Sequence, residues 1–243
     1  MISSVKTHIG NVRTNNEDAF YIPPKDSLPK LFIVADGMGG HQGGEIASQM
    51  AVNTVSSYVN DNLSQDCNSQ KIKDILYNAI ILANKKILDT SFKNPELEGM
   101  GTTITAIIFS EKILYIAHVG DSRAYRIRND SIEQLTRDHS LVWEMMEQGR
   151  LTIDEAKTHP MKNIITRALG TDKTVKPDIM EFDFKKDDIF VLCSDGLTNM
   201  IEDDIIKEIV CNLSPTDATL KLIEEANLNG GVDNITVAII KAD

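Results

Sequence analysis

The chain has 243 residues, of which 42% are hydrophobic and 25% charged, a balance typical of a globular protein with a substantial core. Its formal net charge of −11 would be repelled by a phosphate backbone, which argues against sequence-independent binding of nucleic acid. The same excess of carboxylates is compatible with bound cations.

Cysteine usage and hydropathy indicate the compartment. Cys67, Cys193 and Cys211 are far apart and form no C-x-x-C pair, so neither a disulfide framework nor a thiolate zinc site is predicted. The N-terminal segment lacks the apolar core of a signal peptide, and no apolar run approaches the roughly 20 residues that cross a bilayer. We therefore expect a cytoplasmic, soluble protein with no membrane partner. No dimerisation stripe is evident, so we expect a monomer.

The first half of the chain predicts a strand, two helices and a group of strands. Residues 30–35, KLFIVA, form an apolar run typical of a buried strand. An amphipathic helix is expected to begin at Gly43, and a second one near Ser69, which is the expected N-cap. Three closely spaced segments rich in β-branched and aromatic residues predict hairpin-linked strands: 102–110, 112–119 and 123–128.

The second half begins with short helices and loops, from about residue 139 to residue 172. Two strands, two helices and a last strand follow: 179–184, 188–193, 203–212, 215–228 and 234–241. Grouped strands and grouped helices, with no linker between them, predict one α+β domain over residues 1–243.

Acidic residues recur at the ends of apolar segments. The run that starts at Leu31 ends in Asp36-Gly37 and continues as a glycine-rich segment, and a second apolar run ends in Asp195-Gly196. Aspartate is a poor strand residue and is costly to bury without a partner. At a strand end, however, it can project into a cleft from a rigid backbone. Either pair alone is more simply explained as a turn or a helix cap.

Further acidic residues occupy comparable positions: Glu17 and Asp18 after RTNN, Asp121 in VGDSR, and Asp233 before NITVAII. Clustered carboxylates without nearby thiolates favour Mg²⁺ or Mn²⁺ over zinc. Carboxylates from separate strands can hold two such ions and support hydrolysis. Gly37 has no Cβ, so its carbonyl could also reach an ion.

Eight motifs occur in the order known from one enzyme family, between about residues 5 and 240: RTNNEDAF, VADGMGGHQGGEIAS, GTTITAIIF, HVGDSRAYRIR, LTRDHSLV, ITRALG, CSDGLTN and DNITVAII. The chain resembles the metal-dependent protein phosphatases, the type 2C serine/threonine family, in its compact bacterial branch. The resemblance implies a four-layer α/β/β/α sandwich, in which two antiparallel sheets are flanked by helices. It also implies hydrolysis of phosphoserine and phosphothreonine in proteins. The alternative is a catalytically inactive regulatory module on the same fold, which the retained aspartates disfavour.

The resemblance assigns roles to the acidic residues of the core. Asp36 is expected to bridge two Mn²⁺ or Mg²⁺ ions, the carbonyl of Gly37 to bind one of them, and Asp195 and Asp233 to hold the other. A hydroxide that bridges the two ions would then attack the phosphorus directly, with no phosphoenzyme.

The resemblance also assigns roles to residues outside this core set. Asp18, paired in sequence with Glu17, is the favoured contact to the second metal ion, either directly or through water. Asp121 matches a residue that helps to hold a third, weaker metal ion. Arg13 matches the arginine that binds the substrate phosphate, which suits the forked geometry of guanidinium. The expected partners are phosphoprotein substrates and a counterpart serine/threonine kinase.

One position departs from part of the family. Some members carry, directly after Asp-Gly, a histidine assigned as the general acid, whereas this chain has Met38, which cannot donate a proton. His41 is expected to support the loop by hydrogen bonding or to act through water, and metal-bound water is another candidate for the acid. Residues 140–171 correspond to the family's flap beside the cleft. Trp143 within it is expected to pack the flap's own small core or to touch substrate.

Two other phosphate-handling motifs are disfavoured. A thiol-phosphatase loop, C-x5-R, that began at Cys193 would need arginine at position 199, where the chain has asparagine. Cys193 also ends an apolar run, which predicts a buried structural thiol. The glycine cluster 37–44 lacks the Lys-Ser/Thr of a P-loop.

Overall fold

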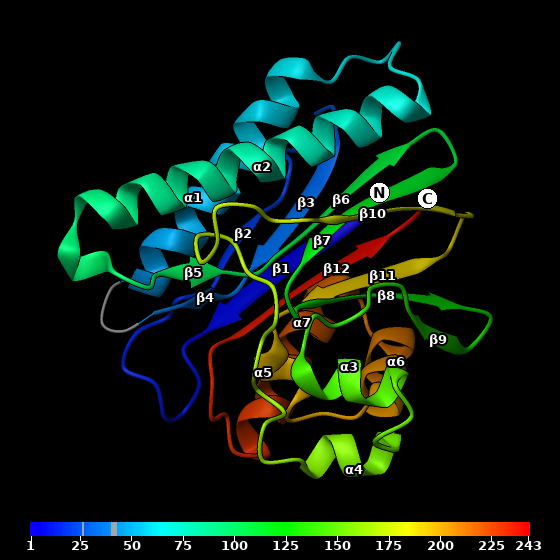
Figure 1. Ribbon diagram of the computed structural model, residues 1–243. Coiled ribbons are helices and arrows are strands. Elements are labelled where there is room, and N and C mark those ends of the chain that lie inside the picture. The colour runs from blue at the N-terminus through cyan, green and yellow to red at the C-terminus, as the bar shows by residue number, and fades with distance from the viewer. Residues whose placement is uncertain (26, 40–42) are drawn as a thin grey trace.

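The computed structural model describes residues 1–25, 27–39 and 43–243, and His41 lies outside these ranges. Two five-stranded antiparallel sheets are stacked on each other (Figure 1). The first sheet has the order β1 (Ile2–His8), β12 (Ile235–Lys241), β11 (Ile189–Cys193), β8 (Arg123–Arg128) and β9 (Ser131–Gln134). The second has the order β10 (Asp178–Asp183), β7 (Ile113–Val119), β6 (Ile104–Ser110), β3 (Lys30–Ala35) and β2 (Ala19–Tyr21). A two-stranded ribbon joins β4 (Gly37–Met38) and β5 (Gly101–Thr102).

Helices cover both outer faces. The long helices α1 (Gly43–Asn62) and α2 (Ser69–Lys93) pack on the second sheet, and a 3₁₀ turn, η1 (Pro95–Leu97), follows them. The first sheet is covered by α5 (Asp195–Thr198), α6 (Asp203–Asn212) and α7 (Pro215–Leu228), on the opposite side of the molecule (Figure 1). The expected four-layer α/β/β/α sandwich is therefore confirmed.

Strand β3 shows why the sequence folds into layers. Successive side chains of a strand point to opposite faces of the sheet. Leu31 and Ile33 therefore pack against the helices, whereas Phe32 and Val34 pack between the two sheets. Because both faces are covered, the strand is apolar along almost its whole length. This apolar run is the pattern that predicted a buried strand from the sequence.

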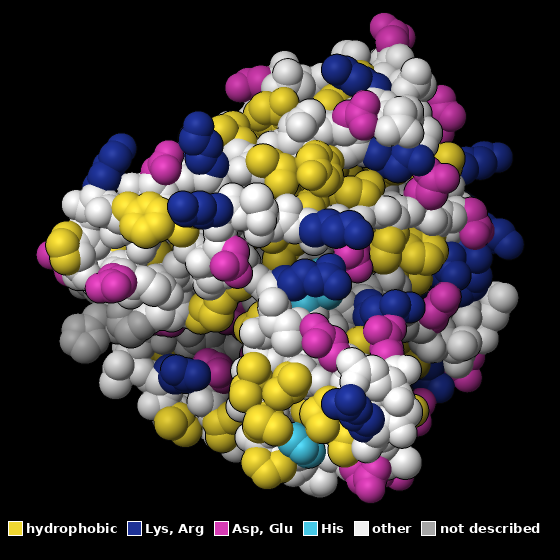
Figure 2. Space-filling model, viewed as in Figure 1, with side chains coloured by type: hydrophobic (Ala, Val, Ile, Leu, Met, Phe, Trp, Pro, Cys, Tyr) yellow, Lys and Arg dark blue, Asp and Glu magenta, His cyan; other side chains and the backbone are white. Residues whose placement is uncertain are grey.

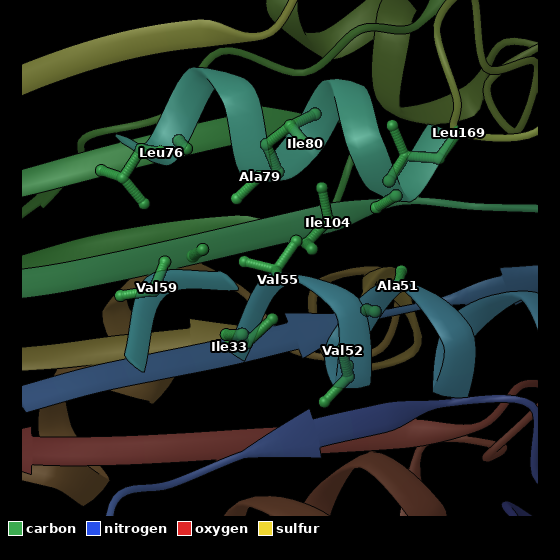
Figure 3. Close-up of a cluster of buried hydrophobic side chains, with 14 of the residues drawn as sticks. Ile33, Ala51, Val52, Val55, Val59, Leu76, Ala79, Ile80, Ile104 and Leu169 are labelled. Carbon is green, nitrogen blue, oxygen red and sulfur yellow. The ribbon is translucent and has the colours of Figure 1, made fainter. Parts of the chain in front are cut away.

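The helix-side core is drawn from distant parts of the chain. Side chains of α1, α2 and the second sheet meet there, among them Val55, Ile80 and Ile104 (Figure 3). Leu169, from the C-terminal end of the flap segment 140–171, joins the same cluster. Its backbone pairs with Thr102 through two hydrogen bonds of 3.0 and 2.8 Å, so the end of the flap is tied to the ribbon beside the site.

Two sequence expectations are corrected in detail. The N-cap of α2 is Asn68, whose side chain accepts a hydrogen bond of 2.9 Å from the Lys71 N–H, and Ser69 is the first helical residue. The segment 102–110 is not one strand, because β5 ends at Thr102 and β6 begins at Ile104. Strands β1, β2 and β9 were not predicted. All three lie at sheet edges and carry polar or exposed residues, so they lack a strong apolar signal.

The flap contains two short helices, α3 (Leu141–Glu147) and α4 (Ile153–Thr158), as the sequence pattern indicated. Its base is closed by backbone pairing: the Leu141 N–H donates to the Ile164 carbonyl at 2.9 Å, and the Thr166 N–H donates to the His139 carbonyl at 2.8 Å. Across the described residues, none of the helices combines the length and apolar composition needed to cross a membrane.

Candidate functional site

Asp36 lies directly after β3, where the strand leaves the sandwich. Its backbone N–H donates to the hydroxyl of Thr103 at 2.9 Å. Its carbonyl accepts from the hydroxyl of Thr102 at 2.8 Å and from the N–H of Thr103 at 2.8 Å. Because these contacts use only the backbone of Asp36, the position of the residue does not depend on its carboxylate.

Gly37 is a position at which the chain approaches itself closely. A Cβ there would lie 2.2 Å from the carbonyl oxygen of Gly44 and 2.5 Å from that of Glu17, so no larger residue fits. The Gly37 N–H donates to the Glu17 carbonyl at 3.1 Å. The glycine-rich segment therefore brings the N-terminal acidic pair and the start of α1 against Asp36.

Asp195 and Asp233 come from the other sheet. Asp195 is the first residue of α5, directly after β11, and its carboxylate accepts a hydrogen bond of 2.9 Å from the Asn199 amide. Asp233 precedes β12. A Cβ at Gly196 would lie 2.0 Å from the Asn234 carbonyl oxygen, so the two segments are in close contact. Strands β3, β11 and β12 thus deliver their aspartates to the same end of the stacked sheets (Figure 1).

These residues line one open cavity of about 570 Å³. The site residues predicted from the sequence that line it are Arg13, Glu17, Asp36, Gly37, Asp121, Asp195 and Asp233. Asp18 lies behind the lining, where its carboxylate accepts a hydrogen bond of 2.8 Å from the Ser194 hydroxyl. Met38 also lines the cavity, and no described histidine does.

The acidic side chains repel one another. Burial, together with the charges of Asp195 and Asp233, raises the pKa of Asp18 to about 7, although its hydrogen bonds oppose the shift. Burial and neighbouring carboxylates raise the pKa of Asp36 and that of Asp121 well above the ordinary value, and they raise that of Asp195 as well. Without a counter-charge these carboxyl groups cannot all be ionised at neutral pH.

A divalent cation fits this cluster. Asp18 Oδ1 and Asp121 Oδ1 are buried and have no hydrogen-bond partner, which is unfavourable for carboxylate oxygens unless an ion or water completes them. Among the described residues, no group of three His, Cys, Asp or Glu side chains is arranged closely enough to hold a metal ion as it stands. Two of the carboxylates are instead paired with protein groups: Arg13 forms an ion pair with Asp233 at 2.7 Å, and the Asn199 amide donates a hydrogen bond to Asp195.

The family model described as protein phosphatase 2C matches residues 3–235, which is nearly the whole chain.

The chain belongs to the protein phosphatase 2C family.

Three relatives show how far the similarity of this phosphatase extends. The serine/threonine phosphatase stp of Listeria monocytogenes is 39% identical over 245 residues, covering 100% of this chain and 96% of that protein. The solved serine/threonine phosphatase of S. agalactiae is 38% identical, with a TM-score of 0.92 and coverage of 100% and 99%. The catalytic domain of the phosphatase PstP, solved with two manganese ions, is 34% identical, with a TM-score of 0.87 and coverage of 100% and 98%.

The phosphatase contains site residues to which the sequence motifs assigned no role. The Asn234 amide donates to the carbonyls of Ile9 and Asn15 at 2.9 Å each, and its Oδ1 accepts from the Glu17 N–H at 2.8 Å. Asn234 therefore fastens the N-terminal acidic segment to the strand that follows Asp233. It stands in the quoted motif DNITVAII, as Asn199 stands in CSDGLTN, but only the folded chain shows what they hold.

Cys193 of the phosphatase is a structural thiol, as predicted. It is fully buried in the core between the first sheet and its helices. Burial raises the pKa of its thiol to about 12, which is the opposite of what a nucleophilic cysteine needs.

We expect Asp18→Asn to stabilise the metal-free phosphatase at pH 8. The folded-state pKa of about 7 lies above the ordinary value of 3.8, so the unfolded chain releases this proton first as pH rises. The free energy of unfolding of the wild type therefore falls between about pH 4 and pH 7, and asparagine does not titrate. The expected difference at pH 8 is on the order of 4 kcal/mol, and it should vanish near pH 4. Urea unfolding in chelator measures it. A wild type more stable than the variant at pH 8 would contradict the assignment.

Proposed function

We propose that the cavity between the two sheets is the catalytic site, and that its carboxylates hold the metal ions while Arg13 binds the phosphate. The chain is a metal-dependent protein serine/threonine phosphatase, a hydrolase of phosphoproteins that uses Mn²⁺ or Mg²⁺. One observation supports this placement of the site: aspartates from both sheets line one cavity, and a buried oxygen of Asp121 in its lining and one of Asp18 behind it have no partner.

The proposed ligands come from the two sheets. Asp36 and the carbonyl of Gly37 follow β3 of the second sheet, whereas Asp195 follows β11 and Asp233 precedes β12 in the first sheet. Asp18, with Glu17 beside it, supports the second ion, and Asp121 supports a third and weaker one. Bound Mn²⁺ or Mg²⁺ supplies Lewis-acid polarisation of the phosphoryl oxygens and a more acidic water for hydrolysis.

Arg13 is placed to bind the phosphate of the substrate. Its side chain is 52% exposed and lines the cavity, so a phosphate can reach it from solvent. Guanidinium binds phosphate through two parallel hydrogen bonds and remains charged at any physiological pH. Its present partner, Asp233, keeps it oriented toward the cluster and raises its pKa further.

The wider assignments rest on the same proposal. The substrates are phosphoproteins, and a serine/threonine kinase supplies them. Residues 1–243 act as one catalytic domain, with residues 140–171 as its flap. The protein works as a monomer, without a membrane partner, in the cytoplasm, where its three free cysteines suit a reducing environment.

The test is release of phosphate from phosphoserine and phosphothreonine peptides by the purified chain with Mn²⁺. We expect turnover within the range of ordinary enzymes, on the order of 1–1,000 s⁻¹. Asp195→Asn is the matched negative control, because asparagine keeps the size of the side chain and removes its charge. Peptides left intact by the wild type would refute the proposal.

A further inference from the structure

A second hollow opens beside the catalytic cavity. It is a groove of about 670 Å³ between the flap helices α3 and α4 on one side and the segment from α5 to the start of α6 on the other. Three residues line both hollows, namely Asp121, Asn163 and Asp195. The groove is therefore a continuation of the catalytic cavity. Its volume exceeds what a single phosphorylated side chain needs, and it lies in the range of about 300–1,000 Å³ common for ligand sites.

The flap side of this groove is apolar. Trp143 and Met146 contribute from α3, and Ile153 contributes from the first turn of α4. Ile201, after α5, faces the same space from the opposite wall. Ile153 is 70% exposed, so its side chain is accessible to an occupant of the groove. Hydrophobic side chains gather on the surface in the region of α3 and α4 (Figure 2).

Several charged groups of the groove are paired within the protein. Arg123 forms a forked pair with the buried Asp138, with a closest contact of 2.7 Å. Lys157 pairs with Glu202 across the mouth of the groove. Asp203 accepts a hydrogen bond of 3.0 Å from the hydroxyl of Tyr125. With these groups paired, the apolar side chains of α3 and α4, together with Ile201, form the part of the wall that an uncharged, apolar side chain would cover.

We infer that the groove is a specificity subsite for a bulky apolar side chain of the phosphoprotein substrate, close in sequence to the phosphorylated residue. The occupant is a polypeptide because the groove continues from the cavity that holds the phosphate, and a phosphoprotein chain must leave that cavity on either side. The inference rests on the proposed function. It extends that function by defining a class of preferred substrates, namely phosphopeptides with an aromatic or long aliphatic neighbour.

The experiment compares two sets of phosphothreonine peptides of otherwise identical sequence. One set carries leucine or phenylalanine at a single position, scanned along both sides of the phosphothreonine, and the other carries alanine there. We expect kcat/KM to be about tenfold higher for the apolar peptide at one position, an effect typical of a filled hydrophobic pocket. Equal kcat/KM at every position would overturn the inference and leave the phosphatase activity intact. No hydrolysis of any peptide would instead refute the proposed function, and the subsite with it.

A matched pair of variants tests whether the groove causes the preference for apolar peptides. Ile153 and Ile205 are exposed isoleucines in the first turns of α4 and α6, where an acidic side chain is favourable to the helix, and only Ile153 lines the groove. In Ile153→Asp the apolar-to-alanine ratio of kcat/KM should fall from about ten to about one. Ile205→Asp should keep both the ratio and the activity of the wild type. Because a ratio is measured within one enzyme, a general loss of activity cannot mimic the result. An unchanged ratio in Ile153→Asp would overturn the inference.

Discussion

Replacing Asp36 by asparagine should lower phosphopeptide turnover by roughly a thousandfold, the scale seen when a preorganised electrostatic group is removed from an active site. Asp36 lines the cavity with Asp195 and Asp233, and burial together with the neighbouring carboxylates raises its pKa. Asparagine has the same shape but lacks the negative charge that a shared cation needs. The measurement is the kcat for a phosphothreonine peptide at saturating Mn²⁺.

The variant should remain folded. The backbone of Asp36 is held by Thr102 and Thr103 without help from its carboxylate, so the local structure survives the substitution. Removing a charge from a cluster of repelling carboxylates should even raise the thermal midpoint in chelator. Asp89→Asn, an exposed change on α2, is the surface control and should behave as the wild type. An Asp36→Asn enzyme with wild-type turnover would refute the role of this residue.

Removing divalent metal should abolish phosphopeptide hydrolysis, and adding Mn²⁺ or Mg²⁺ should restore it. The physical reason is the same cluster, because its carboxylates cannot all be ionised without a counter-charge and two of their oxygens have no partner. Because the metal ion binds the folded protein and not the unfolded chain, it should also stabilise the folded protein, by about 2.7 kcal/mol when the metal concentration is 100 times the dissociation constant. Thermal unfolding with and without Mn²⁺ gives this second readout, which does not depend on activity.

The affinity for metal should depend on pH in a defined direction. Since protons compete with the ion for Asp18, whose pKa is raised to about 7, Mn²⁺ should bind more weakly at pH 6 than at pH 8. Calorimetric titration at the two pH values measures the difference. Full activity in chelator, or a thermal midpoint unaffected by Mn²⁺, would contradict the assignment of the cluster as a metal site. In Asp36→Asn, the stabilisation by Mn²⁺ should be smaller than in the wild type.

Much of the fold could be predicted because many elements are buried on both faces. Strand β3 reads as an unbroken apolar run, and the helix-facing side chains of α2, such as Ile72 and Leu76, recur at helical spacing. Strand β1 could not be predicted in the same way. It is an edge strand with exposed polar residues, and it forms because β12 offers it a complete ladder of backbone partners, from Ile2 opposite Lys241 to His8 opposite Ile235. That partner lies at the other end of the chain.

The residues of the candidate site also differ in whether the local sequence could indicate them. Asp36 and Asp195 could be singled out locally, since each follows an apolar strand and precedes glycine. The supporting residues could not. Asn234 matters because its amide reaches the backbone of the N-terminal loop, and Ser194 because its hydroxyl reaches Asp18. Nothing in the neighbouring sequence indicates contacts between residues so far apart in the chain, such as Asn234 and Ile9, which are separated by 225 residues.

By itself, the sequence determined the family and indicated the acidic residues proposed to carry the chemistry, because motif order and strand-end carboxylates are local properties of the chain. Only the tertiary structure decided which of those carboxylates are buried, which are paired and which lack a partner. It buries Asp18 behind the cavity, pairs Arg13 with Asp233, and leaves oxygens of Asp18 and Asp121 without a partner. It also places the flap opposite α5, which creates the groove beside the site. Burial, repulsion and cavity shape depend on distances between segments remote in sequence, and those distances exist only once the two sheets have packed.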